Sequence, residues 1–288
     1  MTILVTAATG QLGRLVVESL LKKVPAEQIA VAVRSPEKAA DLAALGVQVR
    51  QADYAKPETL GAALAGVDKV LLISGTDMGE RVGQHQAVID AAKEAGVSLL
   101  AYTSVLGGDD ATFALADDHK ATEAAVRASG IPFVLLRHGW YTENYTAQLG
   151  TFLEHGAVVG SSGDGRVASA TRQDFAEAAA AVLAGEGHAN TVYELSGDTA
   201  WSFSEFAAAV SAQAGKPVVY QDLAPGDHLQ VLLGAGLPAP LAEVLVDVDA
   251  GIGRGDLAHT PGDLSRLIGR PTTPLADSIT SALHENAQ

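Results

Sequence analysis

Short apolar runs alternate with amphipathic stretches over the first half of the chain. The runs lie at Ile3–Val5, Ile29–Val33, Val47–Val49, Val70–Ile73, Leu99–Tyr102 and Phe133–Leu136. They are continuous rather than alternating, which is typical of strands buried on both faces of a parallel sheet. The intervening stretches have helical spacing, and several end at a glycine (Gly46, Gly66, Gly96 and Gly130). This order predicts an α/β fold, a doubly wound Rossmann sheet with helices on both faces.

The pattern changes after Leu136. The segment 156–168 is rich in glycine and serine and predicts short strands and turns, whereas residues 173–183 predict an alanine-rich helix. Residues 191–195 predict a strand that returns to the sheet edge. Ser202 and Glu205 have the spacing of a capping box. We therefore expect a Rossmann domain over residues 1–137, completed by the strand near 191–195, and a smaller, mostly helical cap over residues 138–288 that binds substrate.

Composition and charge narrow the possible partners. The 288 residues carry a net charge of −15, which counts against nucleic acid or an anionic membrane as the main partner. The chain has no cysteine, so disulfides and cysteine metal sites are excluded, and we expect no metal site. No apolar run approaches the ~20 residues that span a bilayer. The first residues run straight into a strand without a basic leader, so we expect a cytoplasmic protein.

The first strand leads into a glycine-containing turn, Thr6-Ala7-Ala8-Thr9-Gly10-Gln11-Leu12-Gly13. Gly10 allows the backbone to approach a pyrophosphate, and Gly13 allows the following helix to pack closely on the strand. The helix N-terminus offers free N–H groups to the phosphates. Ala7 stands where the first glycine of the motif normally lies, and it costs roughly 1 kcal/mol if its φ is positive. The turn predicts a dinucleotide site; the alternative is that glycine serves only tight packing.

Arg34 ends the second strand, where NAD-binding proteins normally carry a carboxylate for the ribose 2′-hydroxyl. A guanidinium there favours the 2′-phosphate of NADP, and Lys38 adds positive charge. The alternative is a solvated arginine at a strand end. Asp53, which ends the third strand, suits either a contact near the adenine or a cap for the following helix.

Ser104 ends the fifth strand, where short-chain dehydrogenases carry a catalytic serine, but the usual Tyr/Lys pair does not follow it. His119 and Glu123 have that spacing instead. His119 could act as a general acid. We favour the other interpretation, in which His119, Lys120 and Glu123 lie on the solvated face of a helix.

The segment His138-Gly139-Trp140-Tyr141-Thr142-Glu143-Asn144-Tyr145 leaves the carboxyl end of the sixth strand, where open α/β sheets bind ligands. Its aromatic and polar side chains suit a nicotinamide and a planar partner. The alternative is an aromatic plug between the sheet and the cap.

Several segments resemble the atypical short-chain dehydrogenases of the NmrA-like group, and within that group the bacterial quinone reductases. The resemblance covers nearly the whole chain and is carried by Thr9–Gly13, Val33–Pro36, Arg50–Tyr54, Leu71–Ser74, Ala101–Ser104, Gly139–Tyr145, Ala168–Arg172, Tyr193–Asp198 and Leu267–Thr272. It implies NADPH-dependent transfer of hydride to quinones or similar planar acceptors without flavin. Two residues depart from the pattern: Ala7 replaces a glycine, and His138 stands where asparagine is expected.

The resemblance also implies site residues. It places the quinone near Tyr141 and Asn144, which are the candidate catalytic residues. Together with the turn and the strand ends, it predicts NADP contacts from Ala8, Thr9, Gly10, Gln11, Leu12, Gly13, Arg34, Ser74, Gly75, Thr76, Ser104, His138, Gly139, Trp140, Tyr141, Thr142 and Glu143. A quinone is a strong hydride acceptor, so proton donation is less demanding, and water or Asn144 can stabilise the developing oxyanion.

Two other functions stay open. One is reduction of triphenylmethane dyes. The other is a non-catalytic regulator of the NmrA type that senses NADP, which the missing Tyr/Lys pair favours. We expect a small-molecule partner rather than nucleic acid or membrane, and a homodimer is compatible with such folds.

Overall fold

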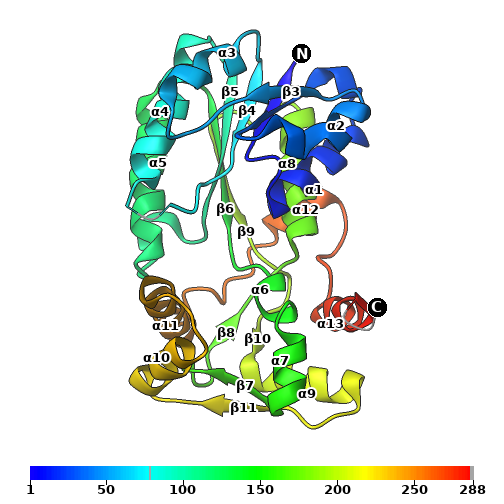
Figure 1. Ribbon diagram of the computed structural model, residues 1–288, viewed down its shortest axis with the longest axis vertical. Helices are drawn as coiled ribbons and strands as arrows, with labels where there is room; N and C mark the ends of the chain where they lie inside the picture. Colours follow the sequence, from blue (N-terminus) through cyan, green and yellow to red (C-terminus); the bar gives the residue numbers. More distant parts are fainter. Residues whose placement is uncertain (78, 286–288) are drawn as a thin grey trace.

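The computed structural model describes residues 1–77 and 79–285. Seven parallel strands form its central sheet in the order β3-β2-β1-β4-β5-β6-β9 (Figure 1). The strands are β1 (Ile3–Thr6), β2 (Ile29–Val33), β3 (Gln48–Gln51), β4 (Lys69–Leu72), β5 (Leu99–Val105), β6 (Phe133–His138) and β9 (Thr191–Leu195). The predicted Rossmann sheet and its returning edge strand are confirmed. The strand order extends toward one edge of the sheet from β1 to β3 and toward the other edge from β4 onward, so it reverses between β1 and β4.

Helices cover both faces of this sheet. One face carries α1 (Gln11–Leu21), α8 (Arg172–Ala184) and α12 (Asp263–Ile268), and the other carries α3 (Leu60–Leu64), α4 (Arg81–Glu94) and α5 (Leu115–Ala128). Helix α2 (Ala40–Ala44) packs near the sheet edge. Short 3-10 turns lie at Ala26–Gln28, Pro36–Ala39, Pro57–Thr59 and Gly108–Asp110. The four predicted terminal glycines all have positive φ.

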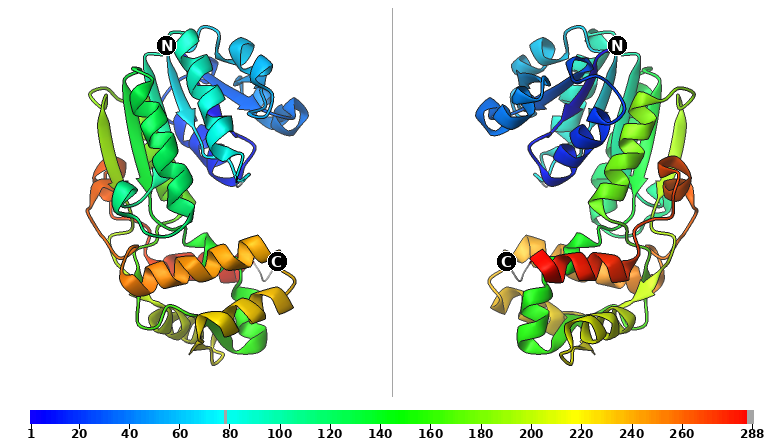
Figure 2. Two further views of the ribbon diagram at one scale, coloured as in Figure 1. Left: turned by 90° about the vertical axis from the view of Figure 1, so that its left-hand side faces the viewer. Right: turned by 90° about the vertical axis from the view of Figure 1, so that its right-hand side faces the viewer.

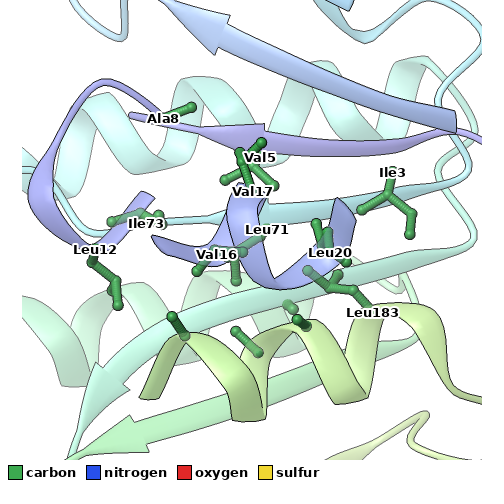
Figure 3. Packing of buried hydrophobic residues seen from close by; sticks show 14 of the residues in the cluster. Ile3, Val5, Ala8, Leu12, Val16, Val17, Leu20, Leu71, Ile73 and Leu183 are labelled. Atoms are coloured by element: carbon green, nitrogen blue, oxygen red, sulfur yellow. The ribbon is translucent and has the colours of Figure 1, made fainter. Parts of the chain in front are cut away.

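Alternate residues of the inner strands β1, β2, β4, β5 and β6 enter opposite cores, whereas the edge strand β3 is exposed or half-buried. Ile3 and Val5 of β1 pack with Val16 and Leu20 of α1 on one face (Figure 3), whereas Leu4 packs with α3 and α4 on the other. Burial on both faces explains why the strands are continuous apolar runs. The two faces together fix the position of the strand ends that carry the site.

A second lobe lies beyond the carboxyl ends of the strands (Figure 2). It contains α6 (Glu143–Thr146), α7 (Leu149–His155), α9 (Phe203–Ala214), α10 (Pro225–Gly234), α11 (Ala239–Arg254) and α13 (Leu275–Glu285). Two small sheets pair β10 (Trp201–Ser202) with β8 (Arg166–Val167) and β11 (Val219–Asp222) with β7 (Ala157–Gly160). A third apolar cluster, centred on Phe206 and Trp201, fills this lobe.

The boundary between the lobes is crossed more than once. The division predicted after residue 137 stays a prediction. Helix α8 and strand β9 follow residue 137 in the chain, but both pack with the first lobe. The capping box of Ser202 and Glu205 is present at the start of α9. No helix within the described ranges is long and apolar enough to cross a membrane.

Candidate functional site: a dinucleotide cleft and an acceptor segment

The turn after β1 is shaped by close backbone contacts. Ala7 has a φ of 49°, in the left-handed region, so the conformation that glycine normally supplies is present here with an alanine. A Cβ on Gly13 would lie 2.4 Å from the Ala7 carbonyl oxygen, which confirms that α1 packs against the turn too closely for a side chain. Gly10 caps α1 without a side-chain bond, and the first helical turn has no acidic residue. The N–H groups of this helix end therefore remain available to an anion.

A cavity of about 330 Å³ lies beside this turn, at the carboxyl ends of β1 to β4. Its position is the topological switch point of the sheet, where doubly wound folds bind ligands. It is lined by Ala7, Thr9, Gly10, Ala32, Val33, Arg34, Ala52, Asp53, Tyr54, Ser74, Gly75, Thr76, Asp77 and Gln84. The cavity therefore brings together the predicted residues of the turn, of the second strand end and of the segment after β4.

Arg34 is the exposed cation of this cavity. Its guanidinium forms no hydrogen bond or ion pair with any other part of the described chain. Lys38 is also exposed, one turn further on. Asp53 lines the same cavity, and its Oδ1 accepts a hydrogen bond from the Ala55 N–H at 3.1 Å. Asp53 therefore caps a turn rather than the following helix.

Sequence reasoning missed the residues that hold the segment after β4. The Gly75 N–H donates to Nε2 of His85 at 2.9 Å, and Nδ1 of His85 bonds Thr122 Oγ1 at 3.0 Å. Burial lowers the pKa of His85 to about 3, which keeps the imidazole neutral and able to accept. The Ser74 N–H donates to Thr103 Oγ1 at 2.9 Å. Nothing in the local pattern of α4 marked His85, because only the packing of α4 on α5 creates this contact.

The helix α5 corrects one sequence interpretation. His119 and Glu123 do not lie on a solvated face, since their exposed fractions are 7 % and 3 %. His119 Nδ1 bonds the Tyr102 hydroxyl at 2.8 Å, and burial lowers the pKa of His119 to about 3. The physical reason is that polar partners on β5 and β6 satisfy these groups, so they pack inward without an unpaired charge. A neutral, hydrogen-bonded His119 does not favour the general-acid interpretation.

Ser104 belongs to a buried charge network. Its hydroxyl donates to Glu123 Oε1 at 2.6 Å. Arg137 binds the same carboxylate through Nε and Nη2 at 2.8 and 2.7 Å, and Nη1 bonds Glu194 at 2.8 Å. The hydrogen bond to Glu123 contributes most to the raised pKa of Arg137. The Ser104 hydroxyl is thus directed into the protein, and its contact with a cofactor stays a prediction.

The segment 138–145, which the sequence predicts to bind the acceptor and which we call the acceptor segment, divides between the two lobes. Tyr141 contacts Phe175 edge-on, with ring centroids 5.3 Å apart, and its hydroxyl bonds His138 Nδ1 at 3.2 Å. Trp140 and Tyr145 instead pack against the apolar cluster of the second lobe. Trp140 and Tyr145 therefore join the aromatic packing, as the plug interpretation expects, whereas Tyr141 packs against the apolar cluster of the first lobe. A ligand contact of Tyr141 and Asn144 stays a prediction.

Short backbone contacts hold this segment in place. The Thr142 N–H donates to the Ala170 carbonyl at 2.9 Å, and the Gly139 N–H donates to the Leu195 carbonyl at 2.7 Å. Thr142 is buried, and its hydroxyl bonds Ser169 at 2.8 Å. A Cβ on Gly139 would lie 3.2 Å from the Leu195 carbonyl oxygen, which explains the glycine.

Arg172, the first residue of α8, is a further residue that sequence reasoning missed. Its guanidinium lies over the Tyr141 ring, with Cζ 4.4 Å from the ring centroid, and Nη2 donates to Asn144 Oδ1 at 3.1 Å. Its backbone N–H donates to Glu143 Oε1 at 2.8 Å. The only available signal was the position of Arg172 directly after Thr171, which caps α8.

The predicted cofactor residues thus fall into two groups. The cavity contains Thr9, Gly10, Arg34, Ser74, Gly75 and Thr76. The remaining predicted residues do not line the cavity. Ala8, Gln11, Leu12 and Gly13 belong to the turn and α1, and residues 138–143 lie at and after the carboxyl end of β6. The Ser104 hydroxyl is bonded to Glu123. The cofactor contacts of all these residues stay predictions.

Comparisons with known proteins agree with this geometry. A family model described as NAD(P)H-binding matches residues 7–186. Quinone oxidoreductase 2 of Escherichia coli is 50% identical over 284 residues, covering 99% of each chain. The crystal structure of the Escherichia coli NADPH-dependent quinone oxidoreductase with NADPH superposes with a TM-score of 0.96, covering 98% of this chain and 100% of that one. The Citrobacter triphenylmethane reductase with NADP(H) is 42% identical, with a TM-score of 0.94 over 98% of this chain and 100% of that one.

These matches span both lobes, so they include the acceptor segment as well as the dinucleotide turn. The turn, the cavity at the switch point and the full-length similarity all agree, and the chain therefore belongs to the NAD(P)H-binding family, among its NmrA-like members.

Proposed function

We propose that this protein is an NADPH-dependent oxidoreductase that reduces quinones or similar planar acceptors without flavin. The observation that carries the proposal is the cavity at the switch point. There the guanidinium of Arg34, which pairs with no group in the described part of the chain, suits a 2′-phosphate. Full-length identity to a quinone oxidoreductase supports the choice of acceptor.

The residues present fit NADPH. The cavity volume of about 330 Å³ lies in the range of ligand pockets. The turn from Ala7 to Gly13 would hold the pyrophosphate, and Arg34 would hold the 2′-phosphate. The segment Ser74–Thr76 would contact the part of NADPH that extends from the pyrophosphate toward the acceptor. His138 Nε2 is buried without a hydrogen-bond partner among the described residues, which supports a polar ligand atom beside it.

When bound, NADPH supplies the hydride. A quinone takes up that hydride and one proton from water, giving the quinol and NADP⁺. The protein has to hold the acceptor flat, exclude water and stabilise the oxygen that becomes negative. We assign the first task to the ring of Tyr141 and the last to the amide of Asn144. In this proposal residues 1–137 with β9 hold the cofactor, and residues 138–288 form the substrate-binding part.

The test is the rate of NADPH oxidation, measured at 340 nm, with a panel of quinones and with NADH in parallel. We expect acceleration by benzoquinones and a preference for NADPH. Loss of NADPH that no quinone or dye accelerates would contradict the proposal and favour a sensor that binds NADP without turnover.

A triphenylmethane dye is the second candidate acceptor, favoured by the 42% identity to the Citrobacter reductase. Dyes in the same panel separate the two, since a quinone reductase gives a higher kcat/KM with quinones. The proposal also includes a cytoplasmic location and a homodimer, which cell fractionation and light scattering test.

A further inference from the structure

Arg172 links the two candidate catalytic residues. It is the first residue of α8, and the exposed fraction of its side chain is 17 %. Its Nη1 lies 3.5 Å from Glu143 Oε2, and its backbone N–H also binds that carboxylate. The Glu143 carboxylate therefore pairs with the guanidinium and fixes the plane of that guanidinium against the acceptor segment.

The contact with Asn144 decides how that amide is oriented. A guanidinium can only donate hydrogen bonds, so the atom of Asn144 that faces Nη2 of Arg172 at 3.1 Å must be the oxygen Oδ1. The amide nitrogen Nδ2 then points away from the arginine. Within residues 1–77 and 79–285, Asn144 Nδ2 has no hydrogen-bond partner. Arg172 thus leaves two N–H donors of Asn144 free.

The contact with Tyr141 places the same positive charge on the ring face. Cζ of Arg172 lies 4.4 Å from the ring centroid, which is within the range of a cation–π interaction. Burial raises the pKa of Tyr141 to about 12, and Arg172 opposes this rise. His138 holds the phenol from the other end through the bond of 3.2 Å to its hydroxyl. Arg172 therefore contacts both the Tyr141 ring and the Asn144 amide.

We propose that Arg172 is a positioning residue for the reduction: it orients the Asn144 amide so that Nδ2 donates to the acceptor oxygen, and it clamps the Tyr141 ring. This inference rests on the proposed function. A lysine cannot reproduce it fully, because its ammonium lacks the planar fork that reaches both neighbours.

The kinetic test compares Arg172→Gln, Arg172→Lys and Asn144→Ala with the double variant Arg172→Gln/Asn144→Ala. We expect Arg172→Gln to lower kcat about 10- to 100-fold, the range found when a supporting residue of a site is removed. The KM for NADPH should stay within about twofold, because Arg172 lies outside the turn. Arg172→Lys should recover part of the loss. In the Asn144→Ala background, Arg172→Gln should cost less than about threefold. Equal losses in both backgrounds would overturn the inference.

A spectroscopic test does not depend on turnover. The side-chain amide signal of Asn144 is followed by ¹H–¹⁵N NMR while tetramethyl-1,4-benzoquinone is added in the presence of NADP⁺. This quinone carries methyl groups at the ring carbons that amines attack. The signal should shift in the wild type and in Arg172→Lys, and not in Arg172→Gln. An identical shift in Arg172→Gln would contradict the role of Arg172.

The two tests separate the inference from the proposed function. A shift that requires Arg172, in a protein that oxidises no NADPH with any acceptor, would refute the reductase and keep the orienting role. Gln173→Ala is the matched control and should leave both readouts unchanged. Gln173 follows Arg172 on α8, and among the described residues its side chain bonds Ser19 and Glu177 and no residue of the segment 138–145. Thermal melts show whether Arg172→Gln folds, and Arg172→Lys replaces it in the cycle if it does not.

Discussion

Gly13 lies so close to Ala7 that a single methyl group cannot be placed between them. An added Cβ on Gly13 would meet the Ala7 carbonyl oxygen at 2.4 Å and the Ala8 Cα at 2.7 Å. These are backbone atoms of the turn that would hold the pyrophosphate. An added side chain at residue 13 could therefore be accommodated only if the turn itself moved.

We expect Gly13→Ala to weaken NADPH binding at least tenfold and to destabilise the fold by about 1 to 3 kcal/mol, the usual cost of overpacking. Fluorescence titration and urea unfolding measure the two effects. Gly61→Ala is the control, since a Cβ there meets nothing within 4 Å and alanine favours its helix α3. Unchanged binding in Gly13→Ala would contradict the assignment of the turn.

Ala7 offers the opposite substitution. Its φ of 49° strains an alanine, so Ala7→Gly should raise the free energy of unfolding by up to about 1 kcal/mol. NADPH affinity should change little, because glycine adopts the same left-handed conformation and leaves the backbone of the turn in place. Urea unfolding of Ala7→Gly and of the control Ala8→Gly checks this: the neighbouring buried residue has no positive φ, and glycine there should destabilise. A loss of stability in Ala7→Gly would show that the strain is absent.

Arg34 should determine the choice of cofactor. A charged hydrogen bond contributes roughly 1.5 to 3 kcal/mol, so Arg34→Ala should weaken NADPH about 10- to 100-fold. NADH lacks the 2′-phosphate and should lose less than about threefold. Binding of both nucleotides is measured by fluorescence, with Lys38→Ala as a control of smaller effect. An equal loss for both nucleotides would rule out the 2′-phosphate contact.

We expect the ion pairs of Arg137 with Glu123 and Glu194 to stabilise the folded protein. Arg137→Met leaves the carboxylate of Glu123, with 5 % side-chain exposure, without its main partner, and the cost should be about 3 to 5 kcal/mol. Adding Glu123→Gln should recover at least half of that cost. The control is Arg166→Met, which breaks an exposed pair with Glu205 and should cost at most about 1 kcal/mol. Equal effects of the two arginine variants in urea unfolding would contradict this account.

Three buried histidines should make the protein less stable in mild acid. Burial lowers the pKa values of His85, His119 and His138 to about 3 in the folded protein, whereas the unfolded chain has ordinary values near 6.5. Between these values the unfolded state binds more protons, so the free energy of unfolding falls as the pH falls from 6.5 toward 3. Each histidine contributes up to about 1.4 kcal/mol per pH unit in this window.

Urea unfolding at several pH values between 7 and 4.5 measures this slope. His85→Gln keeps an acceptor for Gly75 and removes one titrating group, so it should reduce the slope. His155→Gln, at an exposed position at the end of α7, should not. A slope that neither variant changes would assign the acid sensitivity to carboxylates instead.

The sequence by itself determined the sheet and the turn after β1, and it predicted the residues that contact the dinucleotide, because these depend on short-range patterns. Continuous apolar runs, helix-ending glycines and the spacing of Gly10 and Gly13 each act within one strand–helix unit. The position of Arg34 at the end of the second strand likewise follows from the sequence, because Arg34 comes directly after an apolar run. Even the strain at Ala7 follows from local backbone geometry.

Only the tertiary structure decided which polar side chains face inward and which residues support the acceptor segment. His119 and Glu123 have the spacing of a solvated helix face, but partners from β5 and β6 bury them. Helices α6 and α7 and strands β7 and β8 separate Arg172 from Tyr141 along the chain. Arg172 reaches the ring because α8 starts where residues 140–142 pair with residue 170. The energy of a buried polar group depends on its partners, and those partners lie on other elements of the fold.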